Sequence, residues 1–320
     1  MSLNEFGLIN EYFKRSRRDL DNVLVGIGDD AAVLRATANQ DLVVSIDTLI
    51  TGVHFPENTS AYDIGWKALA VNLSDMAAMG AQPAWFTLAL TLPEPSRPWL
   101  EAFSHGLFSL ADQYNLSLVG GDTTRGPLSV TIQIAGHVEK NRALLRSGAQ
   151  AGDDIYVSGT LGDAALALAM IQSDSLSEDI AAELLARLNR PEPRVKLGAV
   201  LVNIAHCAID LSDGLLADLQ HMLETVSLGA ELDTEALPQS SSFAAVAMEN
   251  KQQLQLNGGD DYELCFCASP DKCNEIALLA TEYDIPLTKI GVVTTSQSIF
   301  DMHGTELNKE NTGYQHFTAN

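Results

Sequence analysis

The sequence is poor in cysteine and lacks long apolar runs. Its four cysteines, Cys207, Cys265, Cys267 and Cys273, form no CxxC pair and are too few for a disulfide scaffold, so we expect reduced thiols. No apolar run is as long as the roughly 18 residues that a membrane-spanning helix needs, and the N-terminal residues contain no apolar stretch of signal-peptide length. We therefore expect a cytoplasmic protein.

Basic residues are also scarce. Lys and Arg number 19 against 42 Asp and Glu, which gives a formal net charge of -23. A charge of this sign repels nucleic-acid phosphates and anionic lipid surfaces, so we expect neither nucleic acid nor a membrane as a partner. The acidic excess either serves solubility alone or belongs to a binding site, and the positions of the acids decide between the two.

The length and composition indicate a folded protein of two domains. A chain of 320 residues with 46% hydrophobic residues exceeds the usual size of one hydrophobic core. Between Arg142 and Asp154 the sequence becomes small and polar, which is typical of a domain boundary. We therefore expect an N-terminal domain over residues 1–140 and a C-terminal domain over residues 141–320.

Short apolar runs alternate with segments of helical periodicity, which predicts a mixed α/β or α+β fold. The expected strands are Leu42–Ile46, Leu88–Leu92, Leu116–Val119, Val130–Ala135, Ile155–Ser158 and Lys289–Val293. The expected helices are Ala61–Met79, Trp99–Tyr114, Gly162–Ile171, Ile180–Leu188, Arg194–Ala205 and Gly214–Val226. After residue 226 we expect further short strands.

One pattern, or a near relative of it, occurs in five segments: a short apolar run, then one or two small residues, then aspartate. It occurs in VGIGDDAAV, LVVSIDTLI, LVGGDTTRG, AIDLSDG and LQLNGGDDYEL. The aspartates are Asp29, Asp30, Asp47, Asp122, Asp210, Asp213, Asp260 and Asp261. Strand ends present side chains over one edge of a sheet, and a preceding glycine lets the backbone approach a ligand closely.

A single such turn is most often a helix cap or a tight turn. Five of them favour a shared role, because anions that converge in one cleft repel each other unless cations neutralise them. Carboxylates are the ligands that Mg²⁺ prefers, and each ion usually takes only one or two of them. The pattern therefore indicates several Mg²⁺ ions, although spacing alone does not establish a common cleft.

Asp75 interrupts the apolar helix Ala61–Met79. A buried acid needs a partner, and Asn72, three residues earlier, can lie on the same helix face. Metal binding and a capped or solvent-facing aspartate remain equal alternatives from these residues alone.

Seven segments together resemble the thiamine-monophosphate kinase family, and the resemblance extends over nearly the whole chain. They are GIGDDAAV, SIDTLITGVHF, KALAVNLSDMAAMGA, LVGGDTTRGPL, RSGAQAGD, AIDLSDGLLADL and GGDDYELCF. The family is one of the aminoimidazole ribonucleotide synthetase-like ATP-binding proteins. The resemblance implies an N-terminal α/β domain that binds ATP and metal and forms a homodimer, followed by a C-terminal α/β domain. The sequence contains neither a Walker-type GxxxxGK[ST] loop nor the protein-kinase motifs, as this family predicts.

The resemblance also implies a set of site residues. The implied magnesium ligands are Asp30, Ser45, Asp47, Asp75, Asp122, Asp210 and Asp213. The implied ATP contacts are Gly121, Asp122, Arg146 and Ser212. The implied substrate contacts are His54, Asp260 and Tyr314, and an aromatic ring and a carboxylate would complement the cationic, aromatic thiamine.

Two positions depart from the family pattern. Asp260 stands where the family commonly has Glu, which keeps the charge and shortens the side chain. Ile46 stands where relatives can have a hydroxyl residue, and its side chain cannot bind a metal.

The implied reaction is direct in-line transfer of the ATP γ-phosphoryl group to thiamine monophosphate, a step of thiamine diphosphate biosynthesis. We assign no general base, because the accepting phosphate oxygen is deprotonated at neutral pH.

Two alternative functions stay open. One is a member of the same superfamily that activates a carbonyl oxygen or selenide. The other is an acidic cation-binding or scaffold protein without catalysis, which the absence of an EF-hand spacing disfavours.

Overall fold

The computed structural model describes residues 5–14, 23–28, 31–173, 175 and 178–307. The chain divides into two compact units, Met1–Met76 with Ala81–Arg142 and Ala77–Gly80 with Ala143–Asn320. Helices and sheets mix in both, which confirms the expected fold class. Within the described part of the chain, no helix is long and apolar enough to cross a membrane.

The first unit is built on a four-stranded sheet in the order β3-β6-β4-β5. The parallel pair β4–β5 is joined through a helix, and the other pairs are antiparallel. The strands are β3 (Gln40–Ile50), β4 (Gln82–Leu92), β5 (Ser117–Arg125) and β6 (Ser129–Glu139). Smaller elements precede them: α1 (Glu5–Leu8), η1 (Ile9–Phe13), β1 (Val23–Val25) and β2 (Val33–Leu34).

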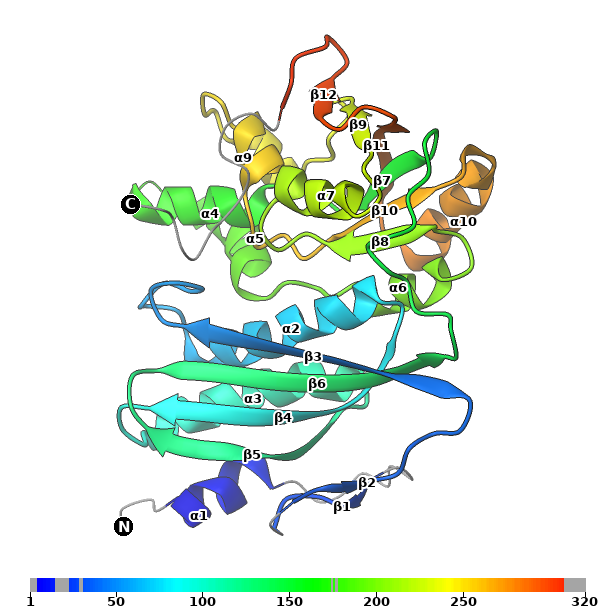
Figure 1. Ribbon diagram of the computed structural model, residues 1–320. Coiled ribbons are helices and arrows are strands. Elements are labelled where there is room, and N and C mark those ends of the chain that lie inside the picture. Colours follow the sequence, from blue (N-terminus) through cyan, green and yellow to red (C-terminus); the bar gives the residue numbers. More distant parts are fainter. Residues whose placement is uncertain (1–4, 15–22, 29–30, 174, 176–177, 308–320) are drawn as a thin grey trace. The chain divides into compact units, whose positions relative to one another are not determined.

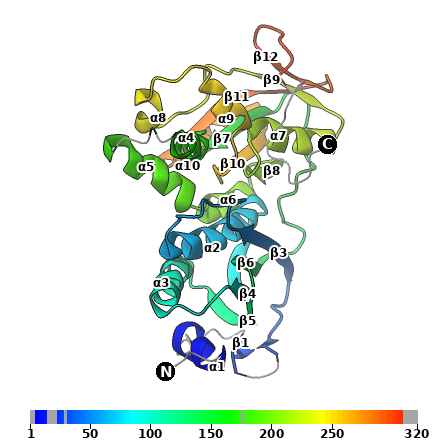
Figure 2. The same cartoon turned by 90° about the vertical axis from the view of Figure 1, so that its left-hand side faces the viewer.

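Two helices, α2 (Ala61–Ala78) and α3 (Arg97–Gln113), cover one face of this sheet (Figures 1 and 2). Their backbones touch, since a Cβ on Gly106 would lie 1.9 Å from the carbonyl oxygen of Tyr62. The apolar stripe of α3, with Leu100, Phe103 and Leu107, is fully buried, as its helical spacing requires. The helices therefore supply the core of the first unit.

The opposite face of β3 is apolar and exposed. Residues of this strand alternate strictly between the two faces, as the period of two in a strand requires. Leu42, Val44, Ile46 and Ile50 point away from α2 and α3, and Ile46 is 62% exposed. None of the described elements of the first unit covers these four side chains.

The second unit is built on a six-stranded sheet in the order β12-β9-β11-β7-β10-β8. Every residue of β7, β8 and β10 is buried, so both faces of the sheet centre are covered. The strands are β7 (Asp154–Ser158), β8 (Cys207–Asp210), β9 (Gly229–Leu232), β10 (Leu264–Ala268), β11 (Leu287–Thr294) and β12 (Ile299–Asp301). Only β9 and β12 pair in parallel.

The helices of the second unit lie between these strands in the chain. They are α4 (Asp163–Gln172), α5 (Glu178–Asn189), α6 (Val195–Leu201), α7 (Leu215–Glu224), α8 (Ser241–Ala245), α9 (Gln252–Asn257) and α10 (Cys273–Tyr283), with the short turn η2 (Pro270–Lys272). Of these, α7 packs against β8 and β9.

Most expected elements are confirmed, and the expected end of one helix was wrong. All six expected strands and all six expected helices coincide with or overlap observed ones. The helix expected to reach Ala205 ends at Leu201, where the carbonyls of Val200 and Leu201 accept turn hydrogen bonds instead. The short strands expected after residue 226 are present as β9 to β12, and the described residues there also form α8, α9, α10 and η2, which the sequence did not predict.

Candidate functional site

In the first unit, β3 and α2 bring three of the predicted magnesium ligands to one face of the sheet. Ser45 and Asp47 are two residues apart on β3 and share its helix-covered face, opposite Ile134 and Ile132 of β6. The Ser45 hydroxyl donates to the carboxylate of Asp75 on α2. Hydroxyl and carboxylate oxygens therefore meet here, on elements held by a packed core.

Asn72 adds a second polar group on α2. Its amide nitrogen donates to the Ala68 carbonyl at 3.0 Å. Its carbonyl oxygen is buried and has no hydrogen-bond partner within the described residues. A buried oxygen of this kind costs stability unless a donor or cation satisfies it. The hard oxygen donors of this region therefore fit Mg²⁺.

His54 lies in a tight turn after β3 that fixes its ring. The backbone N–H of Ile50 donates to Nδ1 of His54 at 3.0 Å, so Nδ1 has no proton and the neutral ring carries it on Nε2. The fully buried ammonium group of Lys67 donates to the His54 carbonyl at 3.1 Å. His54 can therefore donate a hydrogen bond from Nε2 to an anion.

Gly121 and Asp122 line a cavity of about 670 Å³ in the first unit. Gly121 has φ +154°, and an added Cβ would lie 1.9 Å from the Leu88 carbonyl oxygen, so only glycine fits there. Gly26 and Gly28 line the same cavity. The expected turn at Gly121 is instead part of strand β5. Glycines of two segments thus line one cavity, which suits the close approach of backbone N–H groups to phosphate.

Lys14 is a cavity residue that the sequence did not single out. It lies at the end of η1, and its ammonium group would be 3.1 Å from a Cβ added to Gly28. It is the one basic residue among the described residues that line this cavity. No local signal marked it, because the sequence around it does not predict that η1 lies beside β5.

The structure does not place Asp122 beside Asp47 within this unit. The strands β6 and β4 lie between β3 and β5, which separates the two by three strand spacings, about 14 Å. The register also puts Asp122 in a row with Ala89, Thr131 and Thr48, on the face opposite Asp47. The two aspartates therefore cannot bind one ion within a single copy of this unit.

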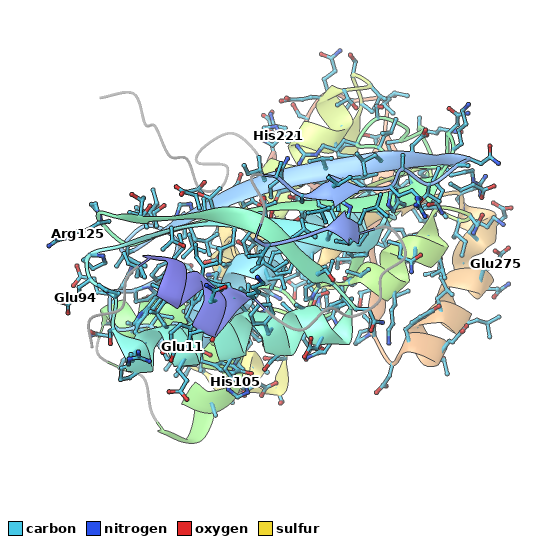
Figure 3. The ribbon with its side chains drawn as sticks, turned by 90° about the horizontal axis from the view of Figure 1, so that it is seen from below. Glu11, Glu94, His105, Arg125, His221 and Glu275 are labelled. Atoms are coloured by element: carbon cyan, nitrogen blue, oxygen red, sulfur yellow. The ribbon has the colours of Figure 1, made fainter. Side chains whose placement is uncertain are left out.

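A second cavity in the first unit, of about 650 Å³, lies between η1 and α3. Glu11 and His105 line it, and Figure 3 shows both from below. Arg97 pairs with Glu11 at its wall. This second cavity contains none of the predicted site residues. Acidic and basic side chains both line it, so their charges offset one another.

In the second unit, Asp210 ends β8 and the next turn carries Ser212 and Asp213. This turn is held by Asp218 of α7, another residue that the sequence did not single out. One carboxylate oxygen of Asp218 accepts the backbone N–H groups of residues 212, 213 and 214 at 3.0 to 3.2 Å. Burial raises the pKa of Asp218 to about 7 although these three donors lower it. The turn is thus fixed from within.

Asp260 lies beside this turn, since its backbone N–H donates to the Ser212 carbonyl at 3.0 Å. The Tyr262 hydroxyl donates to the Asp260 carboxylate at 3.1 Å. The structure therefore brings together four of the predicted residues of the second unit: Asp210, Ser212, Asp213 and Asp260. Arg146, in contrast, lies exposed near the start of the unit.

Two predicted residues, Asp30 and Tyr314, lie outside the described residues. Within the described part of the chain, no three His, Cys, Asp or Glu side chains are arranged as a metal site. Mg²⁺ commonly takes only one or two carboxylates and fills its shell with water and substrate phosphates. The magnesium ligands therefore remain a prediction.

Two family models match the chain. AIR synthase related protein, N-terminal domain, matches residues 28–138, and AIR synthase related protein, C-terminal domain, matches residues 150–303. A thiamine-monophosphate kinase from Salmonella typhimurium is 46% identical over 325 residues, covering 100% of both chains.

Solved structures are similar over the same length. A crystal structure of thiamine-monophosphate kinase from Stenotrophomonas maltophilia K279a has 49% identity and a TM-score of 0.89, covering 96% of this chain and 99% of that one. A structure described as AaThiL complexed with AMPPCP and TMP has 29% identity and a TM-score of 0.80, covering 98% and 97%.

Proposed function

Because the chain belongs to the thiamine-monophosphate kinase family of AIR synthase related proteins, we propose that it converts thiamine monophosphate and ATP to thiamine diphosphate and ADP. The observation that carries this proposal is the 46% identity to such a kinase over the full length of both chains. A relative with a similar structure was solved with AMPPCP and TMP. The protein would act in thiamine diphosphate biosynthesis.

The proposed step is a direct in-line displacement. An oxygen of the acceptor phosphate forms a bond to the γ-phosphorus of ATP while the bond from that phosphorus to the bridging oxygen breaks, and ADP leaves. The acceptor oxygen is already deprotonated, so no side chain needs to remove a proton. The protein's task is to position two anions and to offset their repulsion.

We propose a role in this positioning for each predicted residue. Gly121 and Asp122 of β5 contact the nucleotide, with Arg146 and Ser212 as further contacts. The Nε2 proton of His54 binds an acceptor oxygen, and Asp260 and Tyr314 bind the thiamine part. Several Mg²⁺ ions are held by oxygen atoms of Asp30, Ser45, Asp47, Asp75, Asp122, Asp210 and Asp213. When bound, they supply the positive charge that phosphoryl transfer requires.

Removal of Mg²⁺ tests this proposal. ADP formation should depend on thiamine monophosphate, fall to background when the metal is chelated, and return when Mg²⁺ is added in excess, because ATP and acceptor repel each other without it. Coupled ADP detection measures all three conditions. A rate of ATP consumption that does not depend on thiamine monophosphate but rises with a carbonyl compound or selenide would instead identify an enzyme that activates one of those groups.

We also propose that the protein is a homodimer through the exposed face of β3. Leu42, Val44, Ile46 and Ile50 form an apolar stripe, and burying such side chains between two copies is favourable. Asp122 lies on the same sheet face, so its carboxylate would lie at or near this interface.

Sedimentation of Ile46→Lys tests the dimer. Each dimer loses two buried isoleucines and gains two charges, so the dissociation constant should rise by about 100-fold or more. Leu278→Lys is the matched control, because Leu278 is 70% exposed on α10 of the second unit, and it should leave the dimer intact. A wild-type protein that sediments as a monomer at micromolar concentration would contradict the proposal.

A further inference from the structure

The loop Gly258–Glu263, which precedes β10, has a strained backbone. Asp260 has φ +69° and Tyr262 has φ +50°, a left-handed region that residues with a side chain rarely occupy. Each such residue strains the backbone and persists only where the surroundings impose it. Two of them within three residues therefore require strong anchors.

Backbone hydrogen bonds tie the loop to the turn that carries the predicted metal and nucleotide residues. The N–H of Asp260 donates to Ser212, and that of Tyr262 donates to Leu211 at 2.8 Å. In return, Leu211 donates to the Glu263 carbonyl at 2.8 Å. A Cβ on Gly259 would lie 2.4 Å from the Ser212 carbonyl oxygen, so the two segments are in direct backbone contact.

Glu263 anchors the end of the loop through a buried ion pair. The residue is 1% exposed. Its carboxylate accepts from Nε and Nη2 of Arg194 at 2.6 and 2.5 Å, and from the Ser158 hydroxyl at 2.6 Å. Two parallel bonds of this kind fix orientation as well as position. Gly159, at φ +60°, has no room for a Cβ because the Glu263 carboxylate occupies that space.

Asp261 anchors the middle of the loop. Both of its carboxyl oxygens lie 3.0 Å from the backbone N–H of Gly162, at the start of α4. Burial raises the pKa of Asp261 well above its usual range, and the nearby carboxylates of Asp163 and Glu263 act in the same direction. Asp261 therefore points into the unit, between two residues of left-handed backbone.

The charges around these anchors are nearly balanced. Arg187 lies 3.7 Å from Asp163 and 3.5 Å from Glu263, and Arg194 completes the set. Two guanidinium groups thus face the carboxylates of Asp163 and Glu263. Buried ion pairs add little net stability compared with apolar packing, so stability alone does not explain this cluster.

We propose that Asp261 and the Glu263–Arg194 ion pair are positioning groups. They hold the strained loop so that Asp260 can contact thiamine monophosphate. This inference rests on the proposed function, in which Asp260 contacts thiamine monophosphate. The nucleotide side of the site has its own support, because Asp218 holds residues 212–214 with three hydrogen bonds. Loss of the Glu263 anchor therefore disturbs acceptor binding more than ATP binding.

Steady-state kinetics of Glu263→Gln test the proposal. We expect the KM for thiamine monophosphate to rise by about 10-fold or more, while the KM for ATP changes by less than about twofold. Arg194→Lys keeps the charge and loses the forked geometry, so its effect should be intermediate. Glu192→Gln is the matched control: Glu192 contacts the same arginine at 3.4 Å but is 70% exposed, and both KM values should stay at the wild-type level.

Thermal unfolding of each variant separates positioning from folding. If Glu263→Gln fails to fold because the buried Arg194 loses its charged partner at position 263, Arg194→Lys carries the test, since its charge still faces the Glu263 carboxylate. Folded variants with wild-type KM values for both substrates would overturn the proposal, as would equal changes in both KM values. A wild-type protein that does not phosphorylate thiamine monophosphate would instead overturn the proposed function.

Discussion

The Asp75→Asn variant should fold normally and lose turnover by about 100-fold or more. Asparagine matches aspartate in size and can still accept the hydrogen bond from the Ser45 hydroxyl. It removes the negative charge, however, and an amide is a weaker ligand than a carboxylate for Mg²⁺. In a reaction that depends on charge neutralisation, loss of one such group costs about 3 kcal/mol of transition-state stabilisation.

The kcat at saturating ATP and thiamine monophosphate, followed over a Mg²⁺ titration, measures this effect. The dependence on Mg²⁺ should shift to higher concentration along with the loss of kcat. Asp63→Asn is the matched control, because Asp63 lies in the first turn of the same helix and accepts from the Ser60 hydroxyl at 2.7 Å. Equal kcat values and Mg²⁺ dependence for the two variants would remove Asp75 from the metal site.

The Gly121→Ala variant should be destabilised by about 3 kcal/mol and lose ATP binding. An alanine Cβ would lie 1.9 Å from the Leu88 carbonyl oxygen on β4, which is backbone and cannot rotate away. The φ of +154° adds strain for any residue with a side chain. Strand β5 must therefore shift away from β4, and the wall of the 670 Å³ cavity moves with it.

Denaturant unfolding measures this loss of stability, with Gly52→Ala as the matched control. Gly52 belongs to the same unit and has φ +76°, but nothing lies within 4 Å of its added Cβ. The control should therefore cost only about 1 kcal/mol, from backbone strain alone. Equal losses of unfolding free energy for the two variants would show that the contact with Leu88 does not affect stability.

The sequence predicted the elements well because their apolar periodicity is local. The strand runs in β3, β4, β6, β7 and β11 and the helical runs in α2 to α7 mark the observed elements. The helices α8, α9 and α10 were not predicted, since only further short strands were named after residue 226. Local patterns do not show which strands become neighbours, and here β6 inserts between β3 and β4.

That strand order explains what the sequence could not show about the site. The same local motif carries Asp47 and Asp122, yet the sheet places them on opposite edges and faces. The motif at residues 258–263 likewise presents several acids as one group. In the structure, Asp260 lies beside Ser212 while Asp261 and Glu263 hold the loop from inside. These differences come from partners distant in the chain.

For the same reason, the sequence did not identify the residues that support the predicted site. Lys14, Lys67 and Asp218 each act through a segment far away or through backbone groups of a turn. None belongs to a spacing pattern that predicts a contact. The structure was needed to identify them as neighbours of the predicted residues.

Transfer of label from ATP with a ³²P-labelled γ-phosphate tests the central claim most directly. The protein is mixed with labelled ATP, Mg²⁺ and thiamine monophosphate, and the products are separated by chromatography. We predict that the label appears in thiamine diphosphate, with one ADP formed for each labelled molecule. Label that appears only as inorganic phosphate, with thiamine monophosphate unchanged, would contradict the proposed function.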